Sequence, residues 1–112
     1  MAVPDRGFAE VVLAVVDSIP AGRVMSYGDV AAALGSRAAR GVGQVMAYYG
    51  EASPWWRVLR AGGHPPRGLE SRALAHYRAE ATPVVATTTE AGYRVDYAAC
   101  RYRPWSTADS DD

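Results

Sequence analysis

Hydrophobic positions near the start of the chain recur at helical spacing. The apolar residues are Phe8, Val11, Val12, Val15, Val16 and Ile19. A spacing of three to four residues places them on one face of a helix, and the segment Pro20-Ala21-Gly22 cannot continue it. The pattern predicts an amphipathic helix from about Asp5 to Ser18.

Two shorter helices are predicted next. Ser26 followed by Asp29 has the form of a capping box, and Gly35 ends the helix that follows it. Ser36 is a second N-cap candidate, before a third helix from about Arg37 to Tyr48. That helix has one apolar face, with Arg37, Arg40 and Gln44 directed away from it. Two short helices around a glycine-containing turn are typical of a helix-turn-helix, whose second helix enters a DNA groove.

The second half of the chain mixes short strands with one helix. We expect a turn and strand over Ser53–Leu59, a loop at Gly62–Pro66 that is a candidate wing, and a helix over Leu69–Glu80. A hairpin is predicted from strands over Val84–Thr89 and Tyr93–Tyr97. The expected fold is mainly α with a small β element, a winged helix-turn-helix domain over residues 1–105, followed by an acidic, disordered tail over 106–112.

Composition excludes several classes of function. The chain has 112 residues, enough for one domain, and no apolar run near the ~20 residues that cross a bilayer. It shows no secretion signal, so we expect a cytoplasmic protein without a membrane partner. One cysteine, Cys100, excludes an internal disulfide, and with only two histidines we expect no metal site.

Charge is distributed unevenly although the formal net charge is zero. All twelve basic residues are arginines, and the segment from Arg37 to Arg78 holds seven of them against two glutamates, a local charge of +5. Arginine suits phosphates and guanine edges, so with Trp55 and Trp56 this segment suggests a nucleic-acid partner. A GC-rich genome is an equally good explanation for the absence of lysine.

Several residues are candidates for binding, each with a structural alternative. Adjacent indoles at Trp55 and Trp56 in an extended segment point in opposite directions, so we expect one to be exposed or to line a cavity. Arg40 lies among small residues, including Gly41 and Gly43, which allow close approach either of a nucleic-acid backbone or of another helix. Tyr27 is equally suited to packing or to contacting a phosphate. We expect Cys100 to be an inert thiol.

Three blocks resemble a known family. They are Ile19 to Ala31, Ala39 to Met46 and Pro54-Trp55-Trp56-Arg57-Val58. In this order they resemble the DNA-binding domain of the O6-alkylguanine-DNA alkyltransferases, in which the third block reads Pro-Cys-His-Arg-Val. Trp55 stands at the position of the alkyl-accepting cysteine, as in the alkyltransferase-like proteins. Trp56 replaces a histidine that most of those proteins keep.

The resemblance implies a function and a set of residues. A chain of this kind binds O6-alkylguanine in double-stranded DNA as a monomer, flips the nucleotide and directs the lesion to nucleotide excision repair proteins of the UvrA type, without alkyl transfer or cofactor. Tyr27 matches a tyrosine that rotates the 3′ phosphate, Arg40 a finger that fills the vacated stack, and Arg67 lies in a lesion-sensing loop. The implied DNA contacts are Ser26, Tyr27, Arg37, Arg40, Gly41, Gly43 and Gln44. The implied lesion pocket comprises Tyr27, Met46, Pro54, Trp55, Trp56, Arg57, Val58 and Arg67.

Two other classes of function remain open. A winged-helix transcription regulator would use Arg37, Arg40 and Gln44 to contact base edges and would bind a symmetric site as a dimer. A transferase would need Cys100 to reach the pocket from the C-terminal segment. Competition between alkylated and normal DNA separates a lesion-binding protein from the regulator.

Overall fold

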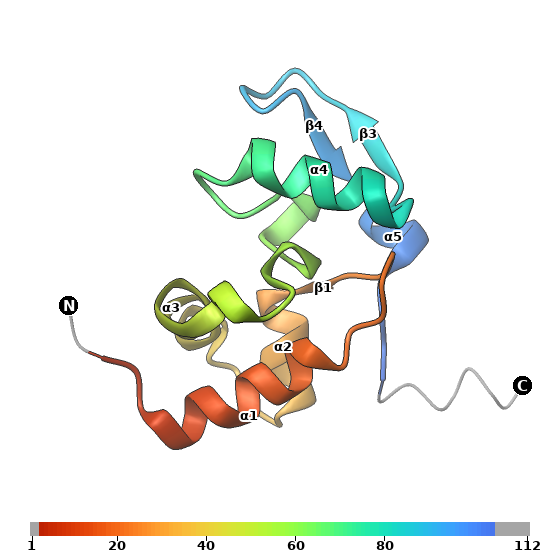
Figure 1. The fold of residues 1–112 in the computed structure, drawn as a ribbon. Helices are drawn as coiled ribbons and strands as arrows, with labels where there is room; N and C mark the ends of the chain where they lie inside the picture. The colour runs from red at the N-terminus through yellow and green to blue at the C-terminus, as the bar shows by residue number, and fades with distance from the viewer. Residues whose placement is uncertain (1–2, 105–112) are drawn as a thin grey trace, which may run out of the picture.

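The computed structural model describes residues 3–104, and the acidic tail predicted over 106–112 lies outside them. Figure 1 shows three helices at one end of the molecule, with a fourth helix and a hairpin at the other. The described elements in chain order are α1 (Arg6–Asp17), β1 (Met25–Ser26), α2 (Tyr27–Ala33), α3 (Ala39–Tyr49), η1 (Gly50–Ala52), η2 (Trp55–Arg57), β2 (Val58–Leu59), η3 (Ala61–Gly63), α4 (Glu70–Glu80), β3 (Val84–Ala86), β4 (Tyr93–Val95) and α5 (Tyr97–Cys100). This arrangement confirms the prediction of a mainly α domain with a small β element.

Side chains cap the starts of the first two helices, and the cap of the second was predicted from the sequence. The Asp5 carboxylate accepts a hydrogen bond from the Phe8 N–H (2.9 Å) and Ser18 closes α1. Ser26 and Asp29 form the predicted capping box, since the Ser26 hydroxyl accepts from the Asp29 N–H and the Asp29 carboxylate accepts from the Ser26 N–H. These reciprocal bonds satisfy two backbone donors at the start of α2 and set where the helix begins.

The helix-turn-helix is formed by α2 and α3, which pack against each other and against α1 (Figure 1). Gly35, with φ of +70°, makes the left-handed turn that ends α2. The predicted start of the third helix was wrong by two residues. Ser36 does not cap α3: its hydroxyl accepts from the Ala38 N–H in a local turn, and the helix begins at Ala39 without a side-chain cap.

Two small sheets complete the fold. β1 and β2 pair in parallel, with Met25 opposite Val58 and Ser26 opposite Leu59, and β3 pairs with β4 in the predicted antiparallel hairpin. The predicted strands were too long: the hairpin strands are three residues each, and Tyr97 begins α5. The parallel pair was not predicted, because its strands are two residues long and 33 positions apart.

The loop at Gly62–Pro66 does not project as the sequence suggested. Gly63, Pro65 and Pro66 are buried, and Arg60 pairs with His64 in an isolated antiparallel bridge around η3. A Cβ atom at Gly63 would lie 2.4 Å from the Val95 carbonyl oxygen, so this backbone is packed tightly on β4. The projecting hairpin in Figure 1 is β3–β4 instead.

The core joins α1, α2 and α3 to the β1–β2 pair, α4 and β4. Its fully buried members include Val12, Val30, Val45, Leu59 and Tyr77. No helix of residues 3–104 is both long and apolar enough to cross a membrane.

Candidate nucleic-acid interface

The exposed side of α3 carries the polar residues that the sequence directed away from the core. Arg40 and Gln44, one helical turn apart on α3, are exposed, as is Arg37 in the preceding turn. Val42 and Val45, on the other side of the helix, are buried in the core. The amphipathic pattern of α3 therefore leaves a cationic, polar face open to a partner.

The two glycines of α3 have different structural roles. A Cβ at Gly41 would lie 3.3 Å from the Phe8 ring, so at this position α1 packs closely against α3. A Cβ at Gly43 would meet nothing within 4 Å, and Gly43 lines a pocket. Close helix packing thus accounts for Gly41, whereas Gly43 keeps the surface beside Arg40 open.

A pocket of about 280 Å³ lies between α3 and the loop before α4. We call it the inner compartment; its lining residues are Tyr27, Gly43, Met46, Ala47, Trp55, Arg60, Pro66, Arg67 and Leu69. It therefore brings together Tyr27, Met46, Trp55 and Arg67 from the predicted lesion pocket. Pro54, Trp56, Arg57 and Val58 do not line it, and Val58 is fully buried in the core.

An open groove of about 940 Å³ adjoins the inner compartment, and the two share Tyr27, Arg60 and Arg67. Arg40 and Ser26 line this groove, together with Gly28, Ala39 and Ala61. The start of α2, the start of α3 and the loop before α4 thus enclose one continuous surface. Its charged groups are all arginines, which suits a polyanion with a part that enters the pocket.

Arg60 belongs to this surface but was not singled out from the sequence. It lines both the inner compartment and the groove, and its Nε donates to the Pro65 carbonyl oxygen (2.8 Å). Because β1 and β2 run parallel with Ser26 opposite Leu59, the residues that follow them, Tyr27 and Arg60, emerge side by side. Only that non-local pairing brings the two together.

Tyr27 keeps its proton at neutral pH. Burial raises the pKa of its phenol, and the nearby positive charge of Arg60 offsets only part of that rise. Its hydroxyl is therefore a hydrogen-bond donor at the junction of pocket and groove. Such a donor fits the predicted contact with a phosphate oxygen, which stays a prediction.

The Trp55-Trp56 pair is not in an extended segment, and that expectation was wrong. The Arg57 N–H donates to the Pro54 carbonyl oxygen (3.0 Å), which closes a 3₁₀ turn over Trp55–Arg57. The two indoles meet edge to face, with ring centroids 5.5 Å apart, instead of lying on opposite faces of a strand. Trp55, only 8% exposed, forms a wall of the inner compartment.

Trp56 lies against α4, outside the inner compartment. Its indole stacks on the His76 imidazole (3.6 Å between centroids, 6° between planes), and its Nε1–H donates to the Glu80 carboxylate (3.0 Å). The Tyr77 hydroxyl donates to the Trp56 carbonyl oxygen (2.6 Å). Trp56 is thus a packing residue that fixes the turn presenting Trp55.

Glu80 joins three segments behind the turn. Its carboxylate accepts from the Gly22 N–H, from Trp56 Nε1–H, and from both Nε and Nη2 of Arg57. Burial opposes its ionisation, but the hydrogen bonds from Arg57, Gly22 and Trp56 outweigh burial and hold the pKa of Glu80 below its usual range. Arg57 also donates to the Ile19 carbonyl oxygen, so it is a structural residue in this fold.

Asp29 supports the start of α2 in a similar way. Its carboxylate accepts from Arg101 Nη2 (2.6 Å), from Arg101 Nε, from the Tyr97 hydroxyl and from the Ser26 N–H. Burial opposes its ionisation, but these hydrogen bonds lower the pKa of Asp29 below its usual range. The C-terminal segment thereby holds Ser26 and Tyr27 in place at the groove.

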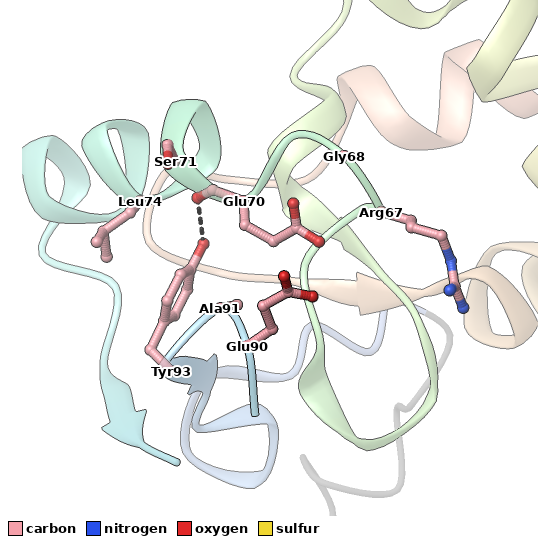
Figure 2. A pocket seen from close by; sticks show the side chains of 8 residues that line it. All are labelled: Arg67, Gly68, Glu70, Ser71, Leu74, Glu90, Ala91 and Tyr93. Atoms are coloured by element: carbon pink, nitrogen blue, oxygen red, sulfur yellow. Dashed lines mark hydrogen bonds between the residues drawn. The ribbon is translucent and has the colours of Figure 1, made fainter. Parts of the chain in front are cut away.

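A different pocket, of about 460 Å³, lies between the start of α4 and the hairpin turn. Figure 2 shows the side chains of Glu70 and Glu90 directed into it, while Arg67 points away from them. The Tyr93 hydroxyl donates to the Glu70 carbonyl oxygen (2.7 Å) and ties the hairpin to α4. Two carboxylates make this pocket unsuited to a nucleic-acid anion, so we place the interface on the opposite side of Arg67.

Cys100 does not contribute to the inner compartment. It is 3% exposed, its thiol donates to the Asp96 carbonyl oxygen, and it lines neither compartment nor groove. Burial, together with the negative charge of Asp96, raises the pKa of the Cys100 thiol to about 11. Across residues 3–104, no three His, Cys, Asp or Glu side chains cluster in a way that could hold a metal ion.

Comparison with known proteins gives the family of this chain. The family model for the DNA binding domain of 6-O-methylguanine DNA methyltransferase matches residues 7–81, and the chain belongs to this family. Two solved structures of an alkyltransferase-like protein from S. pombe are similar to it: S. pombe ATL in complex with DNA, and S. pombe Atl1 in complex with damaged DNA containing O6-carboxymethylguanine. Each is 27% identical, with a TM-score of 0.78, over 89% of this chain and 98% of the other. No curated protein matches at a significant level. These findings confirm the resemblance and the helix-turn-helix fold predicted from sequence.

Proposed function

We propose that this protein recognises O6-alkylguanine in double-stranded DNA and binds it without removing the alkyl group. The observation that carries the proposal is the inner compartment, which has Trp55 as a wall and opens into a groove lined by Tyr27, Arg40 and Arg60. The groove would follow the DNA backbone, and the compartment would receive the flipped nucleotide. The similarity to Atl1 bound to damaged DNA supports this assignment.

The energetics allow binding without chemistry. Extruding a base costs a few kcal/mol, and less for a mispaired, alkylated guanine, so the lesion favours its own extrusion. Contact with the Trp55 indole returns about 1–3 kcal/mol. Arg40, exposed at the start of α3, would place a planar cation in the vacated stack.

Alkyl transfer lacks a nucleophile in the proposed site. An indole offers an apolar face and no group that attacks an alkyl carbon, and Trp56 donates to Glu80, where it cannot act as a base toward the pocket. Cys100 is buried with a raised pKa, which keeps it a thiol at neutral pH. After incubation with DNA carrying radiolabelled methyl groups on guanine O6, we expect unlabelled protein. Stoichiometric label on Cys100 would refute this.

Binding without transfer leaves the lesion in place, so another activity must remove it. We propose that the protein acts as a monomer in the cytoplasm, in association with the nucleoid, and hands the site to nucleotide excision repair proteins of the UvrA type. The bound complex would mark the lesion for them.

The deciding experiment is a titration at fixed salt of a short duplex carrying O6-methylguanine and of the same duplex with guanine. We expect tighter binding of the alkylated duplex and a larger change in tryptophan emission. Trp55→Ala should reduce the ratio of the two affinities while leaving binding to undamaged DNA nearly unchanged, because the arginines carry that binding. An unchanged ratio would place Trp55 in the core only. Sequence-dependent binding with no lesion preference would instead indicate a transcription regulator.

A further inference from the structure

A second space lies next to the inner compartment at Trp55. This outer compartment has a volume of about 200 Å³, and it shares four walls with the inner one: Met46, Ala47, Trp55 and Leu69. Its remaining lining residues are Gly50, Glu51 and Arg72. Trp55 is thus a wall of both compartments, and a substituent long enough to pass the edge of its indole would meet Glu51 and Arg72.

Arg72 lines the outer compartment, and its charge is not part of an ion pair among residues 3–104. It is on α4, and its guanidinium lies over the Trp55 ring, 5.2 Å from the centroid. In residues 3–104 the ion pairs are Arg57–Glu80 and Arg101–Asp29, so Arg72 has no carboxylate partner there. This cation–π contact keeps the guanidinium near the indole, while its N–H donors stay free for an acceptor.

We propose that Arg72 is a specificity-determining residue that favours O6-alkylguanines whose substituent ends in a carboxylate. The inference rests on the proposed function, because it takes the inner compartment to be the site of the flipped guanine. A guanidinium binds a carboxylate through two parallel hydrogen bonds, and because Arg72 is exposed, water screens this contact and keeps the expected preference modest. A methyl group offers Arg72 nothing to bind.

The other charges near the pocket give the proposal its controls. Glu51 lines the outer compartment and opposes the binding of an anion there, whereas Arg60 and Arg67 line the inner compartment and attract one. Arg78 is exposed on the same helix as Arg72 and lines neither compartment. Substituting these residues one at a time therefore shows which of them attracts the carboxylate.

The test compares four duplexes, which carry guanine, O6-methylguanine, O6-(3-carboxypropyl)guanine or its uncharged isostere O6-(3-carbamoylpropyl)guanine. For the unmodified protein we expect the carboxylate to bind about fivefold to tenfold more tightly than the amide. Arg72→Gln should bring that ratio close to one, Arg78→Gln should leave it unchanged, and Glu51→Gln should raise it. In Arg78→Gln, which lines neither compartment, the preference for O6-methylguanine over guanine should persist as well.

The outcomes separate this inference from the proposed function. A carboxylate preference that survives Arg72→Gln, or that disappears in Arg60→Gln or Arg67→Gln instead, overturns the assignment to Arg72 and leaves lesion recognition intact. No carboxylate preference in the unmodified protein overturns it as well. If O6-methylguanine binds no better than guanine, the proposed function and this inference fail together.

Discussion

Removing the charge of Glu80 should destabilise the fold that presents Trp55. In Glu80→Gln the side chain keeps its shape, but one carboxylate oxygen becomes an NH₂ group. Each oxygen of Glu80 accepts from two donors, Oε1 from the Gly22 N–H and Arg57 Nε, and Oε2 from Trp56 Nε1 and Arg57 Nη2. Whichever oxygen is replaced, the two N–H groups that donate to it would then face an NH₂ group, which is itself a donor.

The magnitude follows from the burial of this pair. The side chains of Arg57 and Glu80 are 17% and 12% exposed, so the ion pair is largely withdrawn from water. Breaking a fully buried pair costs about 3–5 kcal/mol, and a hydrogen bond to a charged group contributes about 1.5–3 kcal/mol. We expect Glu80→Gln to lose about 3 kcal/mol of unfolding free energy at pH 7. A domain of this size should then melt on the order of 15 °C lower.

The pH dependence has a definite sign. The folded pKa of Glu80 is lowered relative to the unfolded chain, where a glutamate titrates near ~4.3. Its contribution is therefore complete above the unfolded pKa and is lost as the pH falls through the folded pKa. The stability difference between the unmodified protein and Glu80→Gln should shrink below about pH 4.

Urea unfolding followed by far-ultraviolet circular dichroism at pH 7 and pH 3 measures both effects. The control is Glu10→Gln on the exposed side of α1, which should change stability by less than ~0.5 kcal/mol. A loss below ~1 kcal/mol for Glu80→Gln would mean that the pair behaves like a solvated surface ion pair. The Arg57–Glu80 pair would then not be what fixes the Trp55 turn.

Two further predictions concern the interface and the loop beneath it. Arg40→Ala should weaken binding to O6-methylguanine DNA far more than Arg78→Ala, because only Arg40 lines the groove beside the pocket; equal losses in a direct titration would mean that overall charge is the whole effect. Gly63→Ala should destabilise the protein by several kcal/mol in urea unfolding, because the new Cβ would lie 2.4 Å from the Val95 carbonyl oxygen at a φ of +86°. Gly68→Ala, at a φ of +85° with nothing within 4 Å, isolates the cost of the backbone conformation, and equal losses in the two variants would contradict the clash.

The local signals in the sequence located α1 to α4, but not the short helix α5. Asp5 and the Ser26–Asp29 box set where α1 and α2 begin, because capping depends on residues three positions apart. The start of α3 was misplaced because Ser36 has the right side chain for a cap but bonds to Ala38 in a turn instead. Short-range hydrogen bonding determines these boundaries, and where two local bonds compete the sequence does not say which forms.

The family resemblance likewise came from the sequence, through three ordered blocks, and the match to residues 7–81 confirms it. The site was only partly predictable from those blocks. The third block placed Trp55 and Trp56 together in the site. In the structure, the 3₁₀ turn directs the Trp55 indole into the pocket and the Trp56 indole onto His76 and Glu80. Adjacent residues in a motif thus have different surroundings, because the direction of each side chain depends on the backbone of the turn.

The positions of Arg60 and Arg72 at the site depend on the tertiary structure alone. The parallel pairing of β1 with β2 places Arg60 beside Tyr27, and the packing of α4 places Arg72 over Trp55. In the sequence both are simply members of an arginine-rich segment, and the local charge of +5 does not distinguish them from Arg78. Composition and periodicity determine how much charge the segment carries and which helices form. Where each charge lies relative to the pocket depends on contacts between residues far apart in the chain, which no local pattern encodes.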